Sequence, residues 1–161
     1  MHQYHLHNRP DREITDPAII NEILTNGKFA TIALCRNNEP YIVTLSYGYD
    51  RINQTLYFHC APTGLKIDFI ETNSAACISI IEDGGYVRGE CAHHFKSVVM
   101  WGNLVKTENP DEKRHGMKTL LHHLEPDNDI AEQKLAKSEA FYQRMEVLKF
   151  EITQLHAKAG K

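Results

Sequence analysis

The sequence predicts a single, mainly β domain: a small antiparallel β-barrel with helices on its periphery. Three observations favour this class. Six runs rich in β-branched and aromatic residues follow one another, most of them are joined by short turns, and the helical segments fall between strands without regular β-α-β alternation. This lack of alternation argues against a parallel, dinucleotide-binding sheet. The six predicted strands are residues 29–36, 40–50, 55–60, 75–83, 97–107 and 147–155.

The length and net charge of the chain exclude several classes of function. The chain has 161 residues, which suits one domain over 1–161, with residues 1–12 expected to form a flexible or exchanged tail. The net charge is -3 and there is no block of Lys and Arg, so we expect no nucleic-acid partner. No apolar run reaches membrane-spanning length and the N-terminus is too polar for a secretory signal. These features predict a cytoplasmic protein without a membrane partner.

The first elements can be placed in order along the chain. Thr15 or Asp16 can cap a helix that begins at Pro17 and stops at Gly27. Two hairpins follow from the short connections between the next three strands. In residues 40–50 the side chains alternate, and one face is large and apolar while the other is small and polar. The first face holds Tyr41, Val43, Leu45, Tyr47 and Tyr49, and the second holds Ile42, Thr44, Ser46 and Gly48.

The second half mixes helices with the remaining strands. A Pro-Thr-Gly turn leads into a short helix over 63–73, with Leu65 and Phe69 on one face. Residues 84–95 are predicted as a loop between two strands. A helix of about fifteen residues begins at Pro110 and ends at Pro126, and residues 132–145 are expected to be helical in part. The last strand alternates apolar and polar residues, which is typical of a half-buried strand.

The turn "PTGLK" is a candidate anion site. The start of a helix presents unpaired N–H groups and a partial positive charge, to which this stretch adds the Thr63 hydroxyl, the flexible Gly64 backbone and the Lys66 ammonium. The alternative is an ordinary strand-to-helix turn with Thr63 as the N-cap and Lys66 in solvent. A helix terminus contributes roughly 0.3 to 1 kcal/mol to an exposed anion, so a phosphate held here needs a large ligand body bound elsewhere.

Histidine and cysteine side chains raise further possibilities. His59 ends its strand just before the turn and could donate a proton or hydrogen-bond a ligand, although a structural role explains it as well. Cys60 could line the same site. A metal site has to be weighed, but neither histidine cluster has an established ligand spacing, so no protein-bound metal is predicted. The clusters are Cys91, His93 and His94, and, in the tail, His2, His5 and His7.

Four stretches in register resemble the flavin-binding split-barrel family related to pyridoxamine 5'-phosphate oxidase, and within it the nitroimidazole-resistance branch. They are "NRPDREITD", "PYIVTLSYGYD", "LYFHCAPTGLKIDFI" followed by "AACISI", and "FKSVVMWGNLVKTENPDEK". The resemblance runs from about residue 8 to about residue 126. It implies a six-stranded antiparallel split β-barrel with peripheral helices.

The resemblance also implies a cofactor and a function. It implies a homodimer that binds FMN at its interface, with FAD possible and haem a weaker alternative. It further implies a flavin-dependent reductase that acts on nitroaromatic or other small electron-accepting substrates, in which His59 lies beside the flavin and handles the substrate. The alternative is a non-catalytic flavin- or haem-binding protein. By similarity, the cofactor contacts are Ile42, Val43, Thr44, Leu45, Phe58, His59, Cys60, Thr63, Gly64, Lys66, Ser97 and Val98.

Two departures from the oxidase pattern stand out. The oxidase has a Ser-Arg-Lys phosphate clamp where this chain has Gly64, Leu65 and Lys66, so one cationic arm is missing. The oxidase's C-terminal Arg-and-His substrate motif has no counterpart in residues 150–161. These differences argue against oxidation of vitamin B6.

Overall fold

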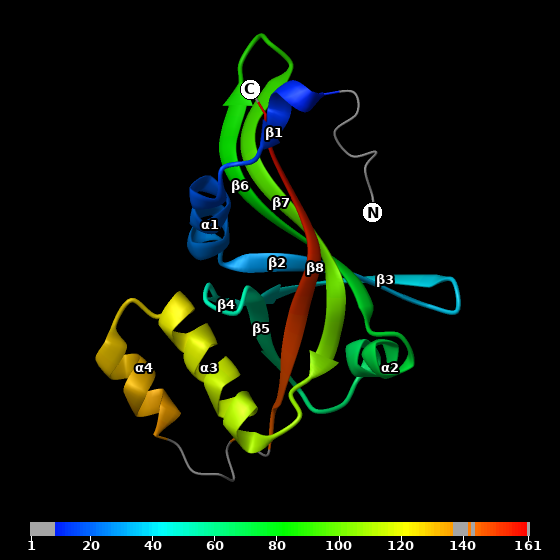
Figure 1. The fold of residues 1–161 in the computed structure, drawn as a ribbon, viewed down its shortest axis with the longest axis vertical. Coiled ribbons are helices and arrows are strands. Elements are labelled where there is room, and N and C mark those ends of the chain that lie inside the picture. The colour runs from blue at the N-terminus through cyan, green and yellow to red at the C-terminus, as the bar shows by residue number, and fades with distance from the viewer. Residues whose placement is uncertain (1–8, 137–141, 143, 161) are drawn as a thin grey trace.

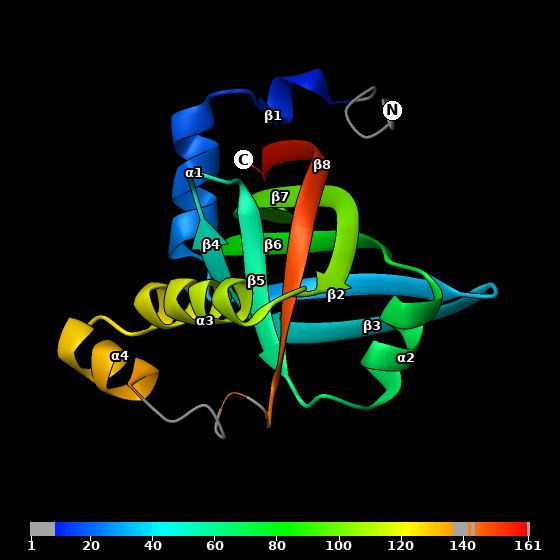
Figure 2. The same cartoon turned by 60° about the horizontal axis from the view of Figure 1, so that its bottom comes forward.

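The computed structural model describes residues 9–136, 142 and 144–160, and in them eight strands form one strongly curved antiparallel sheet (Figures 1 and 2). The strand order is β3-β2-β6-β7-β8-β5-β4, and β1 pairs with β8. The strands are β1 (Glu13–Ile14), β2 (Phe29–Arg36), β3 (Glu39–Ser46), β4 (Gly48–Asp50), β5 (Thr55–Cys60), β6 (Ala75–Val87), β7 (Ala92–Lys106) and β8 (Glu146–Gly160).

The sheet is a barrel left open on one side. Strands β3 and β4 stand at opposite ends of the strand order, yet only Tyr47 separates them along the chain. The two ends of the sheet therefore return to the same place, and the opening lies between β3 and β5. The predicted fold class, a split β-barrel with peripheral helices, is confirmed. The predicted count of six strands rises to eight because β1 is added and the strand expected at 40–50 is divided into β3 and β4.

The loop predicted for 84–95 is wrong, because most of these residues extend β6 and β7 into a long hairpin. The Gly84-Gly85 pair, which suggested a loop, is accommodated by an irregularity in the pairing between Asp83 and Gly85. Only residues 88–91 form the turn, where Gly89 and Cys91 adopt positive φ. A glycine pair marks a bulge as readily as it marks a loop.

Four helices lie outside the sheet in the described part of the chain: α1 (Pro17–Asn26), α2 (Leu65–Thr72), α3 (Pro110–Leu124) and α4 (Asn128–Leu135). Asp16 caps α1 by accepting a hydrogen bond from the Ala18 N–H at 2.8 Å. A short 3-10 helix, η2 (Pro10–Arg12), precedes β1. The rest of the predicted tail, residues 1–8, lies outside the described residues, as do 137–141 and 143 of the segment expected to be partly helical.

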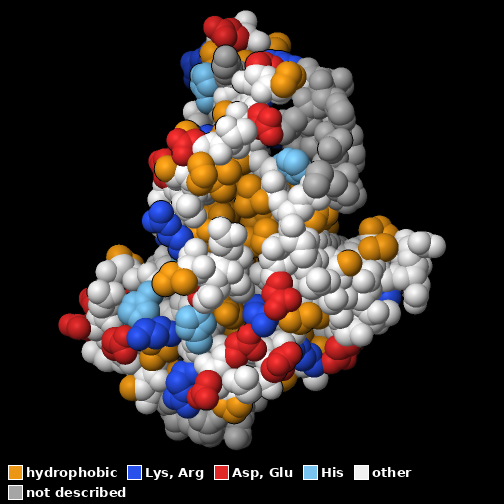
Figure 3. Space-filling model, in the orientation of Figure 1, with side chains coloured by type: hydrophobic (Ala, Val, Ile, Leu, Met, Phe, Trp, Pro, Cys, Tyr) orange, Lys and Arg blue, Asp and Glu red, His pale blue; other side chains and the backbone are white. Residues whose placement is uncertain are grey.

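The core fills the barrel and follows the strand alternation. Its central side chains, including Ile32, Ile78, Met100 and Phe150, are fully buried. A second, smaller cluster joins α3 to β5 and β8 through Met117, Tyr57 and Val147. Figure 3 shows hydrophobic side chains exposed in the central area beside α1, while many charged side chains gather lower, over α3 and α4. Within the described residues, no helix has the length and apolar composition that a membrane crossing needs.

Candidate cofactor site

The candidate site forms where β5 ends and α2 begins. The side chains of β5 from Thr55 to Phe58 are buried, but His59 is exposed and Cys60 is half-buried. The strand therefore leaves the core at the residue predicted to act on a substrate. After four residues of connection, α2 starts at Leu65.

Packing against β2 and β3 fixes the position of α2, as Figure 2 shows. The buried Phe69 ring lies 5.1 Å from the Tyr41 ring, and the Arg36 guanidinium lies 4.3 Å from the centre of the Phe69 ring. At the end of the helix, the Asn73 side chain donates a hydrogen bond to the Cys35 carbonyl at 3.0 Å. Leu65, expected on the same face as Phe69, is instead half exposed, and Ile67 joins the core.

The N-cap of α2 is Gly64 and not Thr63, so the alternative of a Thr63 cap is not what the chain forms. Gly64 has a φ of +124°, a conformation that side chains other than glycine rarely adopt. It brings no capping side chain, and its carbonyl accepts from the Ile67 and Asp68 N–H groups. The N–H groups that open the first turn are therefore available to an anion.

Lys66 is the cation at this helix start. Within the described part of the chain it makes no ion pair, and it is partly exposed. Asp68, two residues further along α2, is the opposing charge and is exposed. Lys106, by contrast, is bound to Glu71 near the far end of α2, which raises the pKa of Lys106. Of these two lysines, only Lys66 lacks a carboxylate partner within the described residues.

The pKa of the Cys60 thiol is affected by nearby charged side chains. Burial raises the pKa of the Cys60 thiol, Lys66 and Lys106 oppose that change, and Glu146 adds to it. Glu146 is the register partner of Cys60 on β8. The raised pKa keeps Cys60 in its neutral thiol form near neutral pH, so it can line a site but is not an activated nucleophile.

The predicted strand contacts divide between two faces. Val43 and Leu45 are partly buried against the core, and Phe58 is fully buried in it, so Phe58 can reach a ligand only through its backbone. Ile42 and Thr44 point outward, and Ile42 is 66% exposed. The division of residues 40–50 into two faces, predicted from alternation, is present in the fold.

Ser97 and Val98 lie at a different part of the barrel. Val98 is fully buried in the core, whereas Ser97 points to the outer face. Ser97 is nine residues from Lys106 along β7, or roughly 30 Å at about 3.3 Å per residue. Lys106 is the end of β7 that contacts α2, so Ser97 lies toward the other end of the strand.

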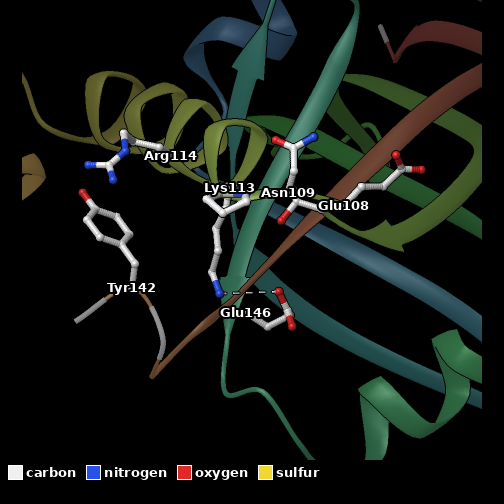
Figure 4. Close-up of a pocket in the computed structure, with 8 residues that line it drawn as sticks. Glu108, Asn109, Lys113, Arg114, Tyr142 and Glu146 are labelled. Carbon is white, nitrogen blue, oxygen red and sulfur yellow. Dashed lines mark ion pairs between the residues drawn. The ribbon is translucent and has the colours of Figure 1, made fainter. Parts of the chain in front are cut away.

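Figure 4 shows a separate cavity of about 340 Å³ near the start of α3. Its charged side chains neutralise one another in part, since the Lys113 ammonium lies 3.8 Å from a Glu146 carboxylate oxygen. Arg114 projects toward the Tyr142 ring, 5.2 Å from its centre. The lining includes none of the predicted cofactor contacts.

The histidine clusters do not form a metal centre within the described residues. His93 and His94 are adjacent on β7, so they project to opposite faces of the hairpin and line different hollows. The tail histidines lie outside the described residues.

This geometry defines an open split barrel, and sequence comparison gives the same class. The family model for pyridoxamine 5'-phosphate oxidase matches residues 16–159. The chain therefore belongs to that family, whose members share an FMN-binding fold. Among curated protein sequences, none matches it significantly.

Solved structures show the same fold. A candidate 5-nitroimidazole antibiotic resistance protein from Bacteroides thetaiotaomicron superposes with a TM-score of 0.79 at 24% identity, covering 92% of this chain and 86% of that one. The FAD and haem binding protein from Mycobacterium smegmatis gives 0.78 at 18% identity, covering 93% and 74%. A FAD-binding protein from Mesorhizobium loti gives 0.67 at 19% identity, covering 93% and 98%.

Proposed function

We propose that this chain is a flavin-dependent oxidoreductase that holds FMN, or FAD, at the interface of a homodimer. The observation that carries the proposal is the start of α2, a few residues after the exposed His59, where N–H groups are open and Lys66 makes no ion pair within the described residues. Backbone N–H groups at a helix start, together with a lysine, can bind a phosphate group, and His59 would then lie beside it. A bound flavin supplies the electron transfer, while the chain supplies position, charge and protons.

The phosphate contact alone does not account for tight binding. A helix start contributes up to about 2 kcal/mol even when partly buried, whereas micromolar affinity corresponds to about -8 kcal/mol. The remainder has to come from the flavin body, for which the outward side chains of β3 and the exposed backbone at the barrel opening are the nearest surface. Because Ser97 lies toward the end of β7 away from α2, we propose that its predicted contact is made to the flavin of the partner subunit.

The proposed substrates are nitroaromatic or other small electron-accepting molecules. Reduction of a nitro group consumes protons as well as electrons, so the site needs a proton donor. His59 fits this role because it is exposed, next to the candidate phosphate site, and has no hydrogen-bond partner within the described residues.

The visible absorption spectrum of the purified protein is the first test. Flavin bands, with FMN or FAD identified chromatographically after heat release, would support the proposal. A Soret band would move the assignment to a haem-binding protein, a reading favoured by the likeness in fold to the FAD and haem binding protein. A colourless protein that takes up no added flavin would contradict the proposal.

Lys66→Glu tests the phosphate site. Replacing the ammonium with a carboxylate removes an attraction and adds a repulsion, so flavin affinity should fall tenfold or more, since a hydrogen bond to a charged group contributes about 1.5 to 3 kcal/mol. Lys118→Glu makes the same charge change on α3, remote from the site, and should leave affinity unchanged. Equal affinity in both variants would remove Lys66 from the site.

His59→Ala separates chemistry from binding. General acid catalysis contributes roughly 10²- to 10⁴-fold, so reduction of 4-nitrobenzoate by the photoreduced flavoprotein should slow by about that factor while flavin occupancy stays near that of the wild type. His59→Gln, which keeps a hydrogen-bonding group but cannot donate a proton efficiently, should be equally slow. A parallel loss of occupancy and rate would leave His59 with a binding role only.

A further inference from the structure

The cavity in Figure 4 lies where β7 ends and where α3 and β8 begin. The Thr107 N–H donates to the Val147 carbonyl at 3.0 Å, which holds the end of β7 against β8. Two residues later, Asn109 caps α3 by accepting a hydrogen bond from the Glu112 N–H at 2.9 Å. Strand pairing and helix capping therefore set the shape of the cavity, and its volume of about 340 Å³ lies within the usual range for small-ligand sites.

Three side chains of the lining carry hydrogen-bond donors that the described residues leave unused. Thr107 Oγ1 is shielded from solvent and has no partner among them. The Asn109 amide uses its oxygen for the helix cap, and its nitrogen donates to no other described residue. The Lys113 ammonium lies 3.8 Å from a Glu146 carboxylate oxygen, which is beyond hydrogen-bond distance. Donors gathered in one cavity without acceptors favour a ligand that brings acceptor oxygens.

The Thr107 hydroxyl is the most unusual of the three donors. Buried polar groups are nearly always hydrogen-bonded, and an unpaired one costs free energy. Rotation about the Cα–Cβ bond of a threonine exchanges the positions of its hydroxyl and methyl groups. Because Thr107 lines the cavity, this rotation would present the hydroxyl to a bound molecule, while the apolar methyl group takes the shielded position.

Two cations on α3 favour a negatively charged ligand. Lys113 and Arg114 are consecutive residues, and both line the cavity. The Arg114 guanidinium lies 5.2 Å from the centre of the Tyr142 ring, which holds it at the cavity wall. An ammonium with unused N–H groups binds carboxylate or phosphate oxygens through charge-assisted hydrogen bonds.

Two carboxylates also line the cavity, and they act differently. Figure 4 shows the Glu108 carboxylate directed away from Lys113. Glu146, by contrast, competes with a ligand for Lys113. Its carboxylate also accepts from the Val147 N–H at 3.1 Å, so it keeps a partner on β8 when a ligand takes its place at the ammonium.

We infer that this cavity binds a small organic anion, whose carboxylate or phosphate oxygens accept hydrogen bonds from Lys113, Asn109 and Thr107. The organic part of the molecule would lie toward Arg114 and Tyr142, which form another part of the lining. None of these residues is a predicted flavin contact, so the site stands apart from the proposed function.

Amide NMR titrations of the purified protein test this site. Phenyl phosphate and benzoate are the probes, because they share an aromatic body and differ in the charged head group. The amide shifts of Lys113 and Asn109 report binding in the cavity, while those of α2 report binding at the candidate phosphate site. Saturable shifts in the cavity are expected, and the probe with the lower dissociation constant identifies the head group.

Matched variants locate the contacts. Lys113→Met should weaken binding about tenfold and Thr107→Val about threefold, because the first loses a charge-assisted hydrogen bond and the second a neutral one. Glu146→Gln removes the competing charge at similar size, so it should tighten binding of both probes. Lys118→Met, further along α3 beside Glu132, should bind like the wild type.

Thr107→Val also reports on the hydroxyl in the absence of a ligand. Valine replaces an unpaired hydroxyl with a methyl group of similar size, so the urea midpoint of the variant should equal or exceed that of the wild type. A clearly lower midpoint would show that the hydroxyl is already bonded and would contradict its place in the site.

Three results would overturn the site: no shift at millimolar probe, unchanged affinity in Lys113→Met, or weaker binding in Glu146→Gln. Lys66→Glu separates this site from the candidate phosphate site, because it should abolish shifts in α2 and leave those of the cavity unchanged. Loss of the cavity shifts in Lys66→Glu would assign the anion to the start of α2 instead. A protein that lacks flavin but still binds either probe through Lys113 would keep this site and contradict only the flavin proposal.

Discussion

At the scale of single residues, Gly48 shows how the absence of a side chain lets α3 pack closely against β4. A Cβ atom added there would lie 2.4 Å from Leu120 Cα and 2.5 Å from Leu120 N, which are backbone atoms that cannot move aside alone. We predict that Gly48→Ala lowers the free energy of unfolding by about 1 to 3 kcal/mol, the usual cost of overpacking. Urea denaturation of the two proteins measures the difference, and an unchanged midpoint would contradict this close packing.

At the scale of an element, the docking of α3 depends on the protonation of His123. This side chain donates from Nε2 to the Gly27 carbonyl at 2.6 Å and lies against the Tyr47 ring. Burial lowers the pKa of His123; the hydrogen bond to the Gly27 carbonyl opposes that change in part, and Lys28 adds to it. The folded state thus binds a proton less readily than the unfolded chain, whose histidines titrate near 6.5.

The sign of the pH dependence follows from this difference. Above about pH 6.5 neither state is protonated at His123 and the effect is absent; as the pH falls below that value, the unfolded state gains the proton first and stability decreases. We predict that the wild type loses more unfolding free energy between pH 7 and pH 5 than His123→Gln, which keeps a side-chain donor. His94→Gln, exposed on the β6–β7 hairpin, is the control and should follow the wild type.

At the scale of the whole molecule, one outer sheet face is unusually poor in charge. Register places Ile42, Ala33, Cys77 and Trp101 side by side on β3, β2, β6 and β7. Exposed apolar side chains that gather on one surface mark interaction sites. This face is therefore the surface we assign to the proposed homodimer.

Ile42→Arg tests that assignment. A guanidinium in the centre of an apolar interface is costly to desolvate, so the variant should be monomeric at concentrations where the wild type is a dimer, and it should lose flavin at the same time. Light scattering after size-exclusion chromatography gives the mass. Ile52→Arg, on the exposed β4–β5 turn, places the same substitution outside the face and should remain dimeric. A dimer in both variants would locate the interface elsewhere.

The sequence by itself determined the barrel class, the helix after the Pro-Thr-Gly turn, and the two faces of residues 40–50. These features follow from local causes: strand alternation, helix caps and turn residues act within a few positions of one another. It misjudged residues 84–95, because a Gly-Gly pair is equally typical of a loop and of a bulged hairpin. The pairing of Phe95 with Gly160 of β8 is a long-range contact that no local pattern marks.

Only the tertiary structure decided which residues meet. Among the residues it describes, it pairs Lys106 with Glu71 but gives Lys66 no ion pair, and it places Ser97 toward the end of β7 away from α2. It also gathered Lys158, Phe95 and Asp83 around the buried Ser97 hydroxyl, which no local pattern marks. The physical reason is that strand register and sheet curvature bring together residues far apart in the chain, and both are set by the packing of the whole barrel.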